Sequence, residues 1–479
     1  MFNPTQKESP QPKTSTKPAS TEKQFADLVL TNKFGQWMMR AESTSDAGTA
    51  YKWNSLFWQY VHTEEGRSLV AQWLDQHHPD KASSSVAKNA WDFACDRLRQ
   101  EKPAPSVNHH QHIIPTLSGY LHLHTGGRIE LSRPDPSLGV DYVIQAKLSS
   151  RIKEGEDYVP QPVSPQSLFG QFLDASLPDL SIRNVVQELC AQSLLPMNYN
   201  IAGWFVGQGA NGKGVMMEVI EAIHRQSCRL RLDRLAEKFS LEPLVGSSIV
   251  LVDEVANAKF DEELFKSLVA GNGVDVDRKY DKPLRSYRSH AKWIIASNNV
   301  PHIRDKSDGV WRRIVFIPWQ VQIEEGKRIP DLDKKIISSE LNIVLDWLLE
   351  GAVRIVRRGR FRSEDEMPAI IQAQKHTMRL ESDSILAWIE DEGIHCSSST
   401  ETSNEEIYKA YRDWCEQTQR TAMGSEMFWK SLRARFPKMT TSNRRVGSKR
   451  KRFSTLSLIP IENLPTAKQA IILDGNELN

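Results

Sequence analysis

Short runs of apolar residues, separated by polar loops, mark the middle of the chain. Four of them occupy residues 201–206, 249–252, 292–298 and 314–318, and a helix-like run at 215–223 follows the first. Continuous apolar runs, as opposed to alternating ones, are typical of parallel strands that are covered on both faces. The pattern predicts an α/β core with a parallel sheet, which we place at residues 201–330.

A glycine-rich loop joins the first of these strands to the helix that follows it. Its sequence is Gly-Gln-Gly-Ala-Asn-Gly-Lys, at 207–213. Such a loop points backbone N–H groups at phosphates, and its lysine adds a positive charge for the β and γ phosphates. The alternative is a turn that contains several glycines. We expect ATP to bind here, with contacts from Gly207, Gly209, Asn211, Gly212, Lys213, Gly214 and Val215.

One position departs from the usual P-loop pattern. A Ser or Thr hydroxyl normally follows the lysine and ligates Mg²⁺, whereas this chain has Gly214. Either Asp253 and water hold Mg²⁺ here, or hydrolysis is slower. We favour the first explanation, because the other catalytic positions are filled.

Polar side chains stand at the ends of the next two strands. Asp253 and Glu254 follow the run at 249–252, and Asn298 ends the following strand. Ligands of open α/β sheets collect at the carboxyl ends of the strands. We expect Asp253 to hold Mg²⁺, Glu254 to activate water, and Asn298 to contact both the γ-phosphate and that water. The alternatives are solvated carboxylates and a turn-forming asparagine.

Two arginines, Arg312 and Arg313, precede the fourth strand. They are either ordinary surface charge or an arginine finger, which is a guanidinium that reaches the γ-phosphate of a neighbouring subunit. An arginine finger acting in this way would require an oligomeric ring.

The order and spacing of these motifs carry a resemblance to a known family. A P-loop with Asn before Gly-Lys, the Asp253-Glu254 strand, Asn298-x-x-Pro301 and Trp311-Arg-Arg lie within about a hundred residues. This set resembles superfamily 3 helicases, which are AAA+ ATPases, and specifically the phage and plasmid primase-helicase group related to poxvirus primase-helicases. The resemblance implies a Mg²⁺-dependent ATPase that assembles as a homo-hexamer and moves 3′→5′ on DNA. It favours Arg313 over Arg312 as the finger.

A basic segment lies between the acid pair and Asn298, and a helix and a turn precede it. In the resembling helicases, a hairpin here projects into the central channel and grips DNA. Lysines that contact phosphates, together with an aromatic ring that stacks on a base, suit a single strand. The alternative is a solvated loop. The candidate DNA contacts are Arg278, Lys279, Tyr280 and Lys282.

The C-terminal region predicts a winged helix, a DNA-binding fold of helices followed by a basic hairpin. Ser403 and Glu406 form a capping box that opens one helix, and a second helix spans 426–436. Residues 430–452 contain ten Lys or Arg and no acidic residue. The alternatives are a localisation signal and a solvating tail. We expect duplex DNA to contact Lys430, Arg433, Arg444, Arg445, Lys449 and Arg450.

Composition limits the remaining possibilities. The 479 residues carry a net charge of only +2, so positive charge for DNA must be local. Five scattered cysteines and the lack of a long apolar run predict a cytoplasmic protein without a membrane span. We expect a disordered leader at 1–24, a mixed α+β accessory domain with an aromatic core at 25–150, helices at 151–200, C-terminal helices and a linker at 331–380, the winged helix at 381–460 and a tail at 461–479.

These observations favour an ATP-driven replicative DNA helicase of a phage, plasmid or integrated mobile element, which also recognises a replication origin. No acid pattern of a primase precedes the core, so any primase or polymerase partner would be a separate protein. One alternative is an origin-binding initiator that uses ATP only to assemble. Another is a P-loop kinase of small molecules, against which the arginine pair and the basic hairpin speak.

Overall fold

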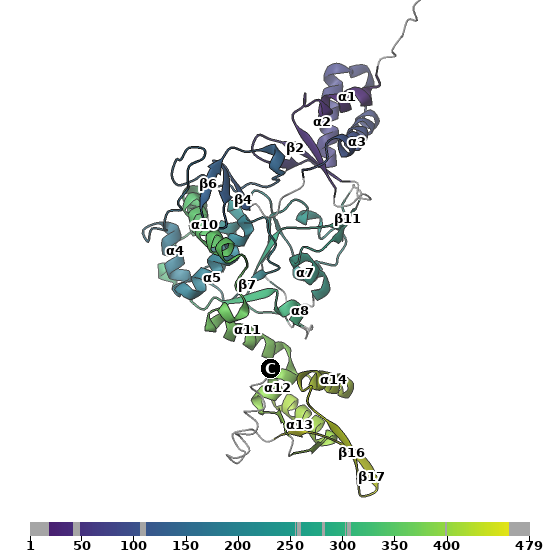
Figure 1. The fold of residues 1–479 in the computed structure, drawn as a ribbon, viewed down its shortest axis with the longest axis vertical. Helices are drawn as coiled ribbons and strands as arrows, with labels where there is room; N and C mark the ends of the chain where they lie inside the picture. Colours follow the sequence, from purple (N-terminus) through teal and green to yellow (C-terminus); the bar gives the residue numbers. More distant parts are fainter. Residues whose placement is uncertain are drawn as a thin grey trace, which may run out of the picture.

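The computed structural model describes residues 19–41, 48–105, 112–253, 255, 260–279, 283–301, 303, 308–397 and 400–458. These residues form three consecutive units, namely a helical N-terminal unit, a central body and a C-terminal unit that follows helix α11 (Figure 1). No helix in the described ranges has both the length and the apolar character that a bilayer span requires.

The N-terminal unit packs three helices against a small antiparallel sheet around an aromatic core. Trp37, Trp73 and Trp91 are 3%, 4% and 2% exposed, so the prediction of an aromatic core is confirmed for them. The elements are α1 (Thr21–Leu30), β1 (Trp37–Arg40), β2 (Thr49–Trp53), β3 (Trp58–Tyr60), α2 (Thr63–His77) and α3 (Ser84–Glu101).

Helix α1 corrects the predicted leader at 1–24. The helix begins at Thr21 because the Ser20 side chain accepts a hydrogen bond from the backbone N–H of Lys23, which caps the first turn. Phe25 and Ala26 then bury the helix against the unit. Residues 1–18 of the predicted leader and the predicted tail at 461–479 lie outside the described part of the chain.

A second antiparallel sheet belongs to the central body. Its strands are β4 (His112–Thr116), β5 (Gly119–Leu123) and β6 (Ile129–Ser132). Ile114, Leu121 and Ile129 share one hydrophobic cluster with α5 (Leu180–Ala191) and α10 (Leu341–Arg358). The predicted accessory domain at 25–150 is therefore divided, because its second half buries its apolar residues in the central body.

The central sheet has five parallel strands in the order β13–β7–β12–β9–β8, which confirms the predicted α/β core with a parallel sheet. Neighbouring residues of a strand point to opposite faces. Thus Trp204 and Trp293 join one hydrophobic cluster, while Phe205 and Ile294 join the other. The strands are β7 (Ala202–Val206), β8 (Ser227–Arg229), β9 (Ile249–Asp253), β12 (Lys292–Ser297) and β13 (Ile314–Pro318).

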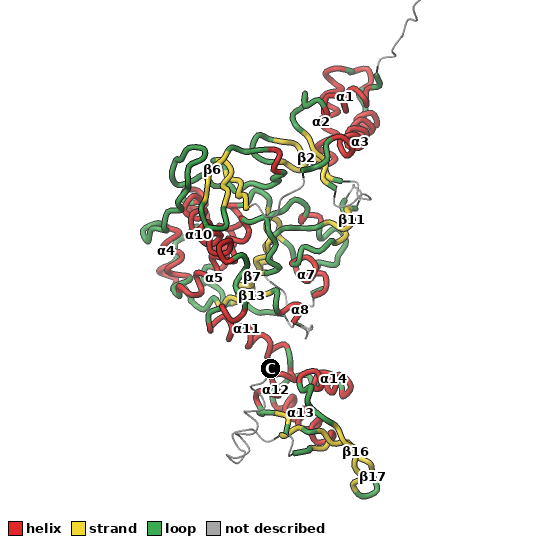
Figure 2. The backbone as a smooth tube through the Cα atoms, viewed as in Figure 1, coloured by secondary structure: helices red, strands yellow, loops and turns green. Residues whose placement is uncertain are grey.

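Helices cover both faces of this sheet (Figure 2). One face carries α4 (Leu168–Ser176), α5, α6 (Lys213–Ile223), α9 (Leu332–Ser339) and α10. The other carries α7 (Glu262–Val269), α8 (Asp308–Trp311) and a hairpin of β10 (Val274–Val276) and β11 (Leu284–Tyr287). With both faces covered, the polar edges of the sheet are left for ligands.

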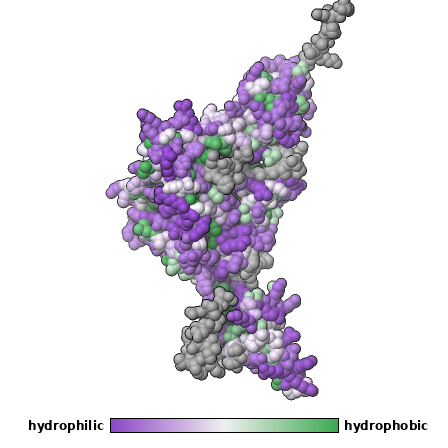
Figure 3. All heavy atoms as spheres, viewed as in Figure 1, coloured by the Kyte–Doolittle hydropathy of each residue, from purple (hydrophilic) through white to green (hydrophobic). Residues whose placement is uncertain are grey.

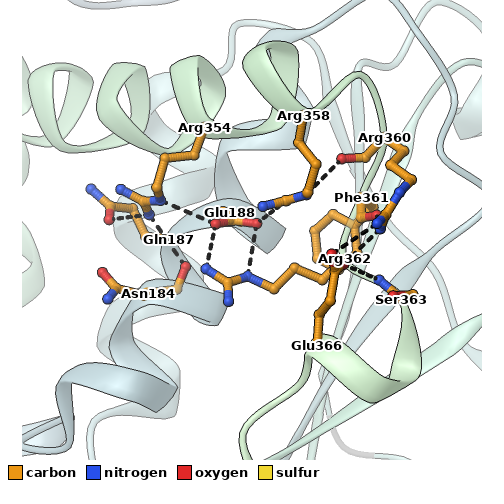
Figure 4. Close-up of polar contacts among 10 residues, drawn as sticks. All are labelled: Asn184, Gln187, Glu188, Arg354, Arg358, Arg360, Phe361, Arg362, Ser363 and Glu366. Carbon is orange, nitrogen blue, oxygen red and sulfur yellow. Dashed lines mark hydrogen bonds and ion pairs between the residues drawn. The ribbon is translucent and has the colours of Figure 1, made fainter.

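A buried carboxylate fastens α5 to α10. The Glu188 side chain is fully buried, and three arginines converge on it (Figure 4). Arg354 Nε donates at 3.0 Å, Arg362 donates through Nε and Nη2 at 3.1 and 2.8 Å, and Arg358 forms a further ion pair. Glu188 thus links two helices and the segment after α10. Burial raises the pKa of Glu188, but the three hydrogen-bonded arginines outweigh this effect and hold the pKa below its usual value.

The C-terminal unit begins after α11 (Ala369–Ser382), which packs against β13. Its core contains Trp388, Tyr411, Phe428 and Leu432. Ser403 and Glu406 form the predicted capping box, which the structure confirms. The elements are α12 (Ser384–Asp391), β14 (His395–Cys396), β15 (Thr402–Ser403), α13 (Asn404–Gln417), α14 (Ser425–Arg435), β16 (Thr441–Val446), β17 (Lys449–Ser454) and β18 (Leu456–Ser457).

Candidate functional site

The glycine-rich loop runs from the end of β7 into the start of α6. Gly212 adopts a φ of +93° at the N-cap, and a Cβ atom there would lie 2.3 Å from Ser176 Oγ. A Cβ atom at Gly207 would lie 2.1 Å from the carbonyl oxygen of Trp319. Only glycine fits these two positions, so the tight turn in front of α6 depends on them.

Trp319 holds the loop from the neighbouring strand β13. Its indole Nε1 donates to the carbonyl of Asn211 at 2.7 Å, and Asn211 Nδ2 donates to the carbonyl of Trp319 at 3.1 Å. The Trp319 backbone N–H also donates to Val206 at 2.7 Å. The sequence analysis missed Trp319, because nothing local distinguishes it from a core tryptophan at a strand end.

Lys213 lies folded against its own loop. Its Nζ donates to the carbonyls of Gly207 at 2.6 Å and Gln208 at 3.2 Å, and to Asn211 Oδ1 at 3.3 Å. The side chain is only 7% exposed, and burial lowers its pKa, an effect that the charge of Asp253 opposes. Phosphate oxygens are stronger acceptors for an ammonium group than carbonyls are, so a triphosphate can take over these contacts.

A cavity of about 770 Å³ lies in front of this loop at the carboxyl edge of the sheet. Strand β12 lies between β7 and β9, with Ala296 paired to Asp253 and Ser297 to Val206. This register brings the ends of three strands together. The lining residues are Gly209, Ala210, Asn211, Gly212, Lys213, Gly214, Val215, Arg231, Asp253, Val255, Ala296, Ser297, Asn298 and Asn299.

Asp253 offers a carboxylate to this cavity. Its side chain is 51% exposed and lies 3.8 Å from Arg229 Nη1. Mg²⁺ in nucleotide sites usually takes one or two carboxylates, the phosphates and several waters. The donor set of Asp253, phosphates and water fits that pattern, and Gly214 contributes no ligand. Glu254, the carboxylate predicted to activate water, lies outside the described residues.

Asn298 and Arg231 complete the wall that faces Lys213. Asn298 was predicted, and it lines the cavity as an exposed side chain. Arg231 was not predicted, because its position after β8 carries no motif. Its guanidinium donates to Asp233 at 3.1 and 2.8 Å and is 55% exposed. Arg231 therefore adds a second cation to the cavity.

A smaller cavity of about 420 Å³ lies on the other side of the loop. It shares Ala210, Gly212 and Val215 with the larger cavity, and Phe172 and Leu332 add apolar surface. Its rim carries Lys327, Arg328, Asp331 and Asp333. If the loop binds phosphates as predicted, a mainly apolar cavity beside it suits the base and ribose of a nucleotide.

Arg312 and Arg313 lie at the opposite edge of the sheet. The carbonyl of Arg313 accepts from the N–H of Ala202, at the amino end of β7, at 2.7 Å. The strand carries the chain about 15 Å from there to the loop. Arg313 Nη1 donates to Gly309 at 2.6 Å, its buried Nε has no hydrogen-bond partner among the described residues, and burial lowers its pKa. Neither arginine reaches the cavity of its own chain.

The predicted single-strand contacts beside the β10–β11 hairpin differ in their exposure. Lys279 is exposed, and its backbone N–H donates to Glu242 Oε1 at 3.1 Å. Arg278 is only 8% exposed and faces the N-terminal unit, so it is not available on the hairpin surface. This burial corrects its prediction as a surface DNA contact. Tyr280 and Lys282 lie outside the described residues.

The hairpin of β16 and β17 extends from the C-terminal unit as a hydrophilic projection (Figure 3). Arg444 pairs with Glu401 and Lys451 with Glu405, so one face of the hairpin is tied to the region around α13. Arg445 pairs across the strands with Arg450, and Asn443 with Arg452. Arg445, Arg450 and Arg452 therefore lie on the opposite face of the hairpin. None of these three arginines has a hydrogen bond or ion pair within the described ranges.

Other predicted DNA contacts also remain on the surface. Lys430 and Arg433 are exposed on α14, and Lys449 is exposed at the tip of the hairpin beside Gly447, which adopts a φ of +63°. The predicted DNA contact of Arg444 is corrected in part, because an ion pair with Glu401 already occupies its guanidinium. Arg452 was missed, since only the strand register shows that it shares a face with Arg445.

Comparisons with known proteins place these regions among related sequences. Residues 205–313 match a protein family of unknown function, DUF5906, and residues 382–452 match the RFX DNA-binding domain. A putative helicase, L207/L206, of Acanthamoeba polyphaga mimivirus is 25% identical over 159 residues. That match covers 31% of this chain but only 16% of the mimivirus protein.

Solved structures of the NrS-1 C-terminal region are also similar to this chain. One apo form has a TM-score of 0.48 at 12% identity and covers 90% of this chain and 99% of that one. A second apo structure, of residues 305–718, has a TM-score of 0.47 at 12% identity, with coverage of 92% and 100%.

Proposed function

We propose that the chain is an ATP-driven DNA helicase of superfamily 3, with an AAA+ core and a C-terminal winged helix, which replicates the DNA of a phage, plasmid or integrated mobile element. The observation that carries the proposal is the cavity in which the P-loop, Asp253 and Asn298 meet at one edge of a parallel sheet. The similarity to a putative viral helicase and to a DNA-binding domain supports it.

In this proposal the two cavities beside the loop divide the nucleotide between them. The triphosphate lies against the loop N–H groups and Lys213, and the base and ribose occupy the smaller apolar cavity. Asp253, together with water, would hold Mg²⁺, which would supply positive charge to the phosphates. Glu254 accepts a proton from water as the water oxygen attacks the γ-phosphorus and the bond to ADP breaks, while Asn298 orients that water.

Arg313 acts on the neighbouring subunit in this scheme. The arginine lies at the sheet edge opposite its own cavity, and such a position suits a finger that crosses a subunit boundary. A head-to-tail ring, which we propose to be a hexamer, repeats this contact at every interface. The basic hairpin and Lys279 would then hold a single strand in the channel, and we propose 3′→5′ movement.

An unwinding assay on forked duplexes tests this function. Wild type is expected to open a fork that carries a 3′ tail when ATP is present, and to leave a fork with only a 5′ tail closed. Glu254→Gln is expected to bind ATP but to lose unwinding by about 100-fold or more, because no base then accepts the proton of the attacking water. Glu416→Gln, an exposed residue of α13, is the control.

Two outcomes of this assay would replace the helicase with another function. Equal opening of forks by wild type and Glu254→Gln would show that hydrolysis drives no movement, as for an initiator that melts an origin by assembly alone. The absence of a hydroxyl at Gly214 is compatible with that alternative. ATP turnover that single-stranded DNA does not stimulate would instead indicate a small-molecule kinase.

The β16–β17 hairpin is expected to bind duplex DNA through one face only. Arg445→Ala with Arg450→Ala should weaken binding of a duplex by about tenfold or more and lower the salt dependence of log K by roughly 1.8, since each B-DNA phosphate contact contributes about 0.9. Fluorescence anisotropy of a labelled duplex at several salt concentrations measures both.

The matched control removes two positive charges from the opposite face. Arg444→Ala with Lys451→Ala should change duplex affinity much less, because both side chains pair with glutamates. Equal losses from the two double variants would mean that net charge, and not the orientation of the hairpin, governs binding.

A further inference from the structure

A polar cavity of about 740 Å³ lies where the N-terminal unit meets the segment that connects β10 to β11. Helices α2 and α3 form half of its wall, residues in and beside the small sheet add to it, and Arg278 and Pro283 close it from the hairpin side. Figure 1 shows β11 beside the N-terminal unit. We call this space the hairpin cavity, and it is separate from the nucleotide cavity at the carboxyl edge of the central sheet.

The walls of the hairpin cavity carry more positive than negative charge. Arg67 from α2, Lys88 and Arg99 from α3, and Arg278 are its basic residues. Its acidic residues are Asp92 and Asp96, and Asp96 is paired with Arg99 at 3.1 Å. The surplus charge attracts an anion into a space that is partly shielded from water.

Two of these cations have no partner among the residues that the structure describes. Arg67 and Lys88 make no hydrogen bond or ion pair with any residue in the described parts of the chain, and Arg67 Nε is shielded from solvent. A shielded guanidinium nitrogen without an acceptor is unfavourable, because desolvation is not compensated. A ligand that brings anionic oxygens into the cavity would give Arg67 Nε an acceptor, and the exposed Lys88 could pair with the same ligand.

The same cavity also offers an aromatic ring. Tyr60, half-buried at the end of β3, lines it together with the cations of α3. Lys88, Asp92 and Arg99 occupy one face of α3, because residues spaced by three or four positions, or by multiples of that spacing, align on a helix. Cations that follow a phosphate backbone, combined with a ring that can stack on a base, are typical of sites for single-stranded nucleic acid.

We propose that the hairpin cavity binds a phosphate-bearing nucleotide unit, and that this unit belongs to the single strand held by the β10–β11 hairpin. Arg278 lies in the cavity wall, while the next residue, Lys279, is exposed on the hairpin. A single strand that passes from the cavity to the hairpin surface would therefore stay in contact with positively charged side chains. The N-terminal unit then acts as a single-strand clamp. The inference rests on the proposed binding of DNA by the core.

The experiment compares two double variants of the full chain, each in the background Arg445→Ala with Arg450→Ala, which removes the contribution of the C-terminal hairpin. Arg67→Ala with Lys88→Ala empties the cavity of its unpartnered cations. Lys23→Ala with Lys81→Ala removes the same charge from exposed positions of the same unit. Anisotropy of a labelled oligo(dT) at several salt concentrations is the measurement, and thermal unfolding checks that each variant is folded.

The cavity variant is expected to bind oligo(dT) about tenfold more weakly and to lower the salt dependence of log K by roughly 1.4, since each single-strand phosphate contributes about 0.7. Its ATP turnover without DNA should equal that of its background. Loss no greater than in the surface variant would overturn the proposal. Displacement of oligo(dT) by millimolar dTMP from the background protein would overturn the strand as the source and identify a free nucleotide as the ligand.

Failure of the helicase proposal and failure of the clamp proposal give different results in these assays. A chain that opens no fork, but whose oligo(dT) affinity still depends on Arg67 and Lys88, would retain the clamp and lose the motor. A chain that unwinds forks, but whose cavity variant matches the surface variant, would retain the motor and lose the clamp.

Discussion

Lys213→Ala and Arg313→Ala are each expected to abolish ATP turnover, and a mixture of the two inactive proteins is expected to regain part of it. Lys213 lies in the nucleotide cavity, whereas Arg313 lies at the opposite edge of the same sheet. If the arginine completes the site of a neighbour, a subunit that carries Arg313→Ala still has an intact P-loop. A neighbour that carries Lys213→Ala still supplies the arginine.

The expected size of the effect follows from the chemistry. Removing the P-loop lysine should lower turnover by at least about 100-fold, as the loss of a preorganised charge does in other sites. Removing the finger should cost about 1,000-fold or more. Random assembly of an equal mixture in a head-to-tail ring pairs an intact loop with an intact finger at roughly a quarter of the interfaces. Turnover of the mixture should approach that fraction of wild type.

Phosphate release at saturating ATP and single-stranded DNA is the measurement. Lys335→Ala, an exposed lysine of α9, is the control for the loss of a positive charge. A mixture that remains as inactive as its components would contradict an arginine that acts across subunits. Full activity of Arg313→Ala alone would remove the arginine from the mechanism.

Glu188→Gln is expected to lower the free energy of unfolding by about 3–5 kcal/mol, the range found when one partner of a buried ion pair is removed. The Glu188 carboxylate is fully buried and is the shared acceptor for Arg354, Arg358 and Arg362. Without its charge, three partly buried guanidiniums are left close together. Denaturant unfolding at neutral pH measures the change.

The stability difference between wild type and Glu188→Gln is expected to depend on pH. Three hydrogen-bonded arginines hold the pKa of Glu188 below its ordinary 4.5 despite its burial, so the unfolded state binds the proton more tightly than the folded state. The stabilisation is therefore complete above about pH 4.5 and is lost as the pH falls through the lower, folded-state pKa. The difference between wild type and Glu188→Gln should shrink in that acidic range.

An ion pair whose carboxylate is exposed supplies the control. Glu263 pairs with Lys266 at 2.6 Å on α7, and its side chain is 84% exposed. Glu263→Gln should change the unfolding free energy by no more than about 0.5 kcal/mol, as is typical of exposed helix pairs. If Glu188→Gln were as mild as this control, the cluster would contribute little to holding α5 against α10.

Several features of the fold and the site could be predicted from local sequence. Apolar runs at 249–252 and 314–318 indicated parallel strands, because strands buried on both faces contain no polar alternation. The capping box of Ser403 and Glu406 was predictable, since its two hydrogen bonds join residues three positions apart. The glycine-rich loop was predictable for the same reason, because its turn and the helix that follows are contiguous.

Contacts between distant segments could not be predicted in this way. Trp319 holds Asn211 across 108 positions, and Arg231 lines the cavity in front of the glycine-rich loop although no motif marks it. Arg278 resembled an exposed DNA contact, but the N-terminal unit buries it. The environment of each of these residues depends on tertiary contacts between distant segments. Local charge patterns contain no information about those contacts.

The sequence by itself determined the class of the core, the position of the glycine-rich loop and the existence of two basic hairpins. Those properties follow from the periodicity and spacing of neighbouring residues. Only the tertiary structure decided on which sheet edge Arg313 lies, which face of the C-terminal hairpin is unpaired, and that Glu188 gathers three arginines. The physical reason is that strand register and helix packing set these distances, and both result from burying apolar surface across the whole chain.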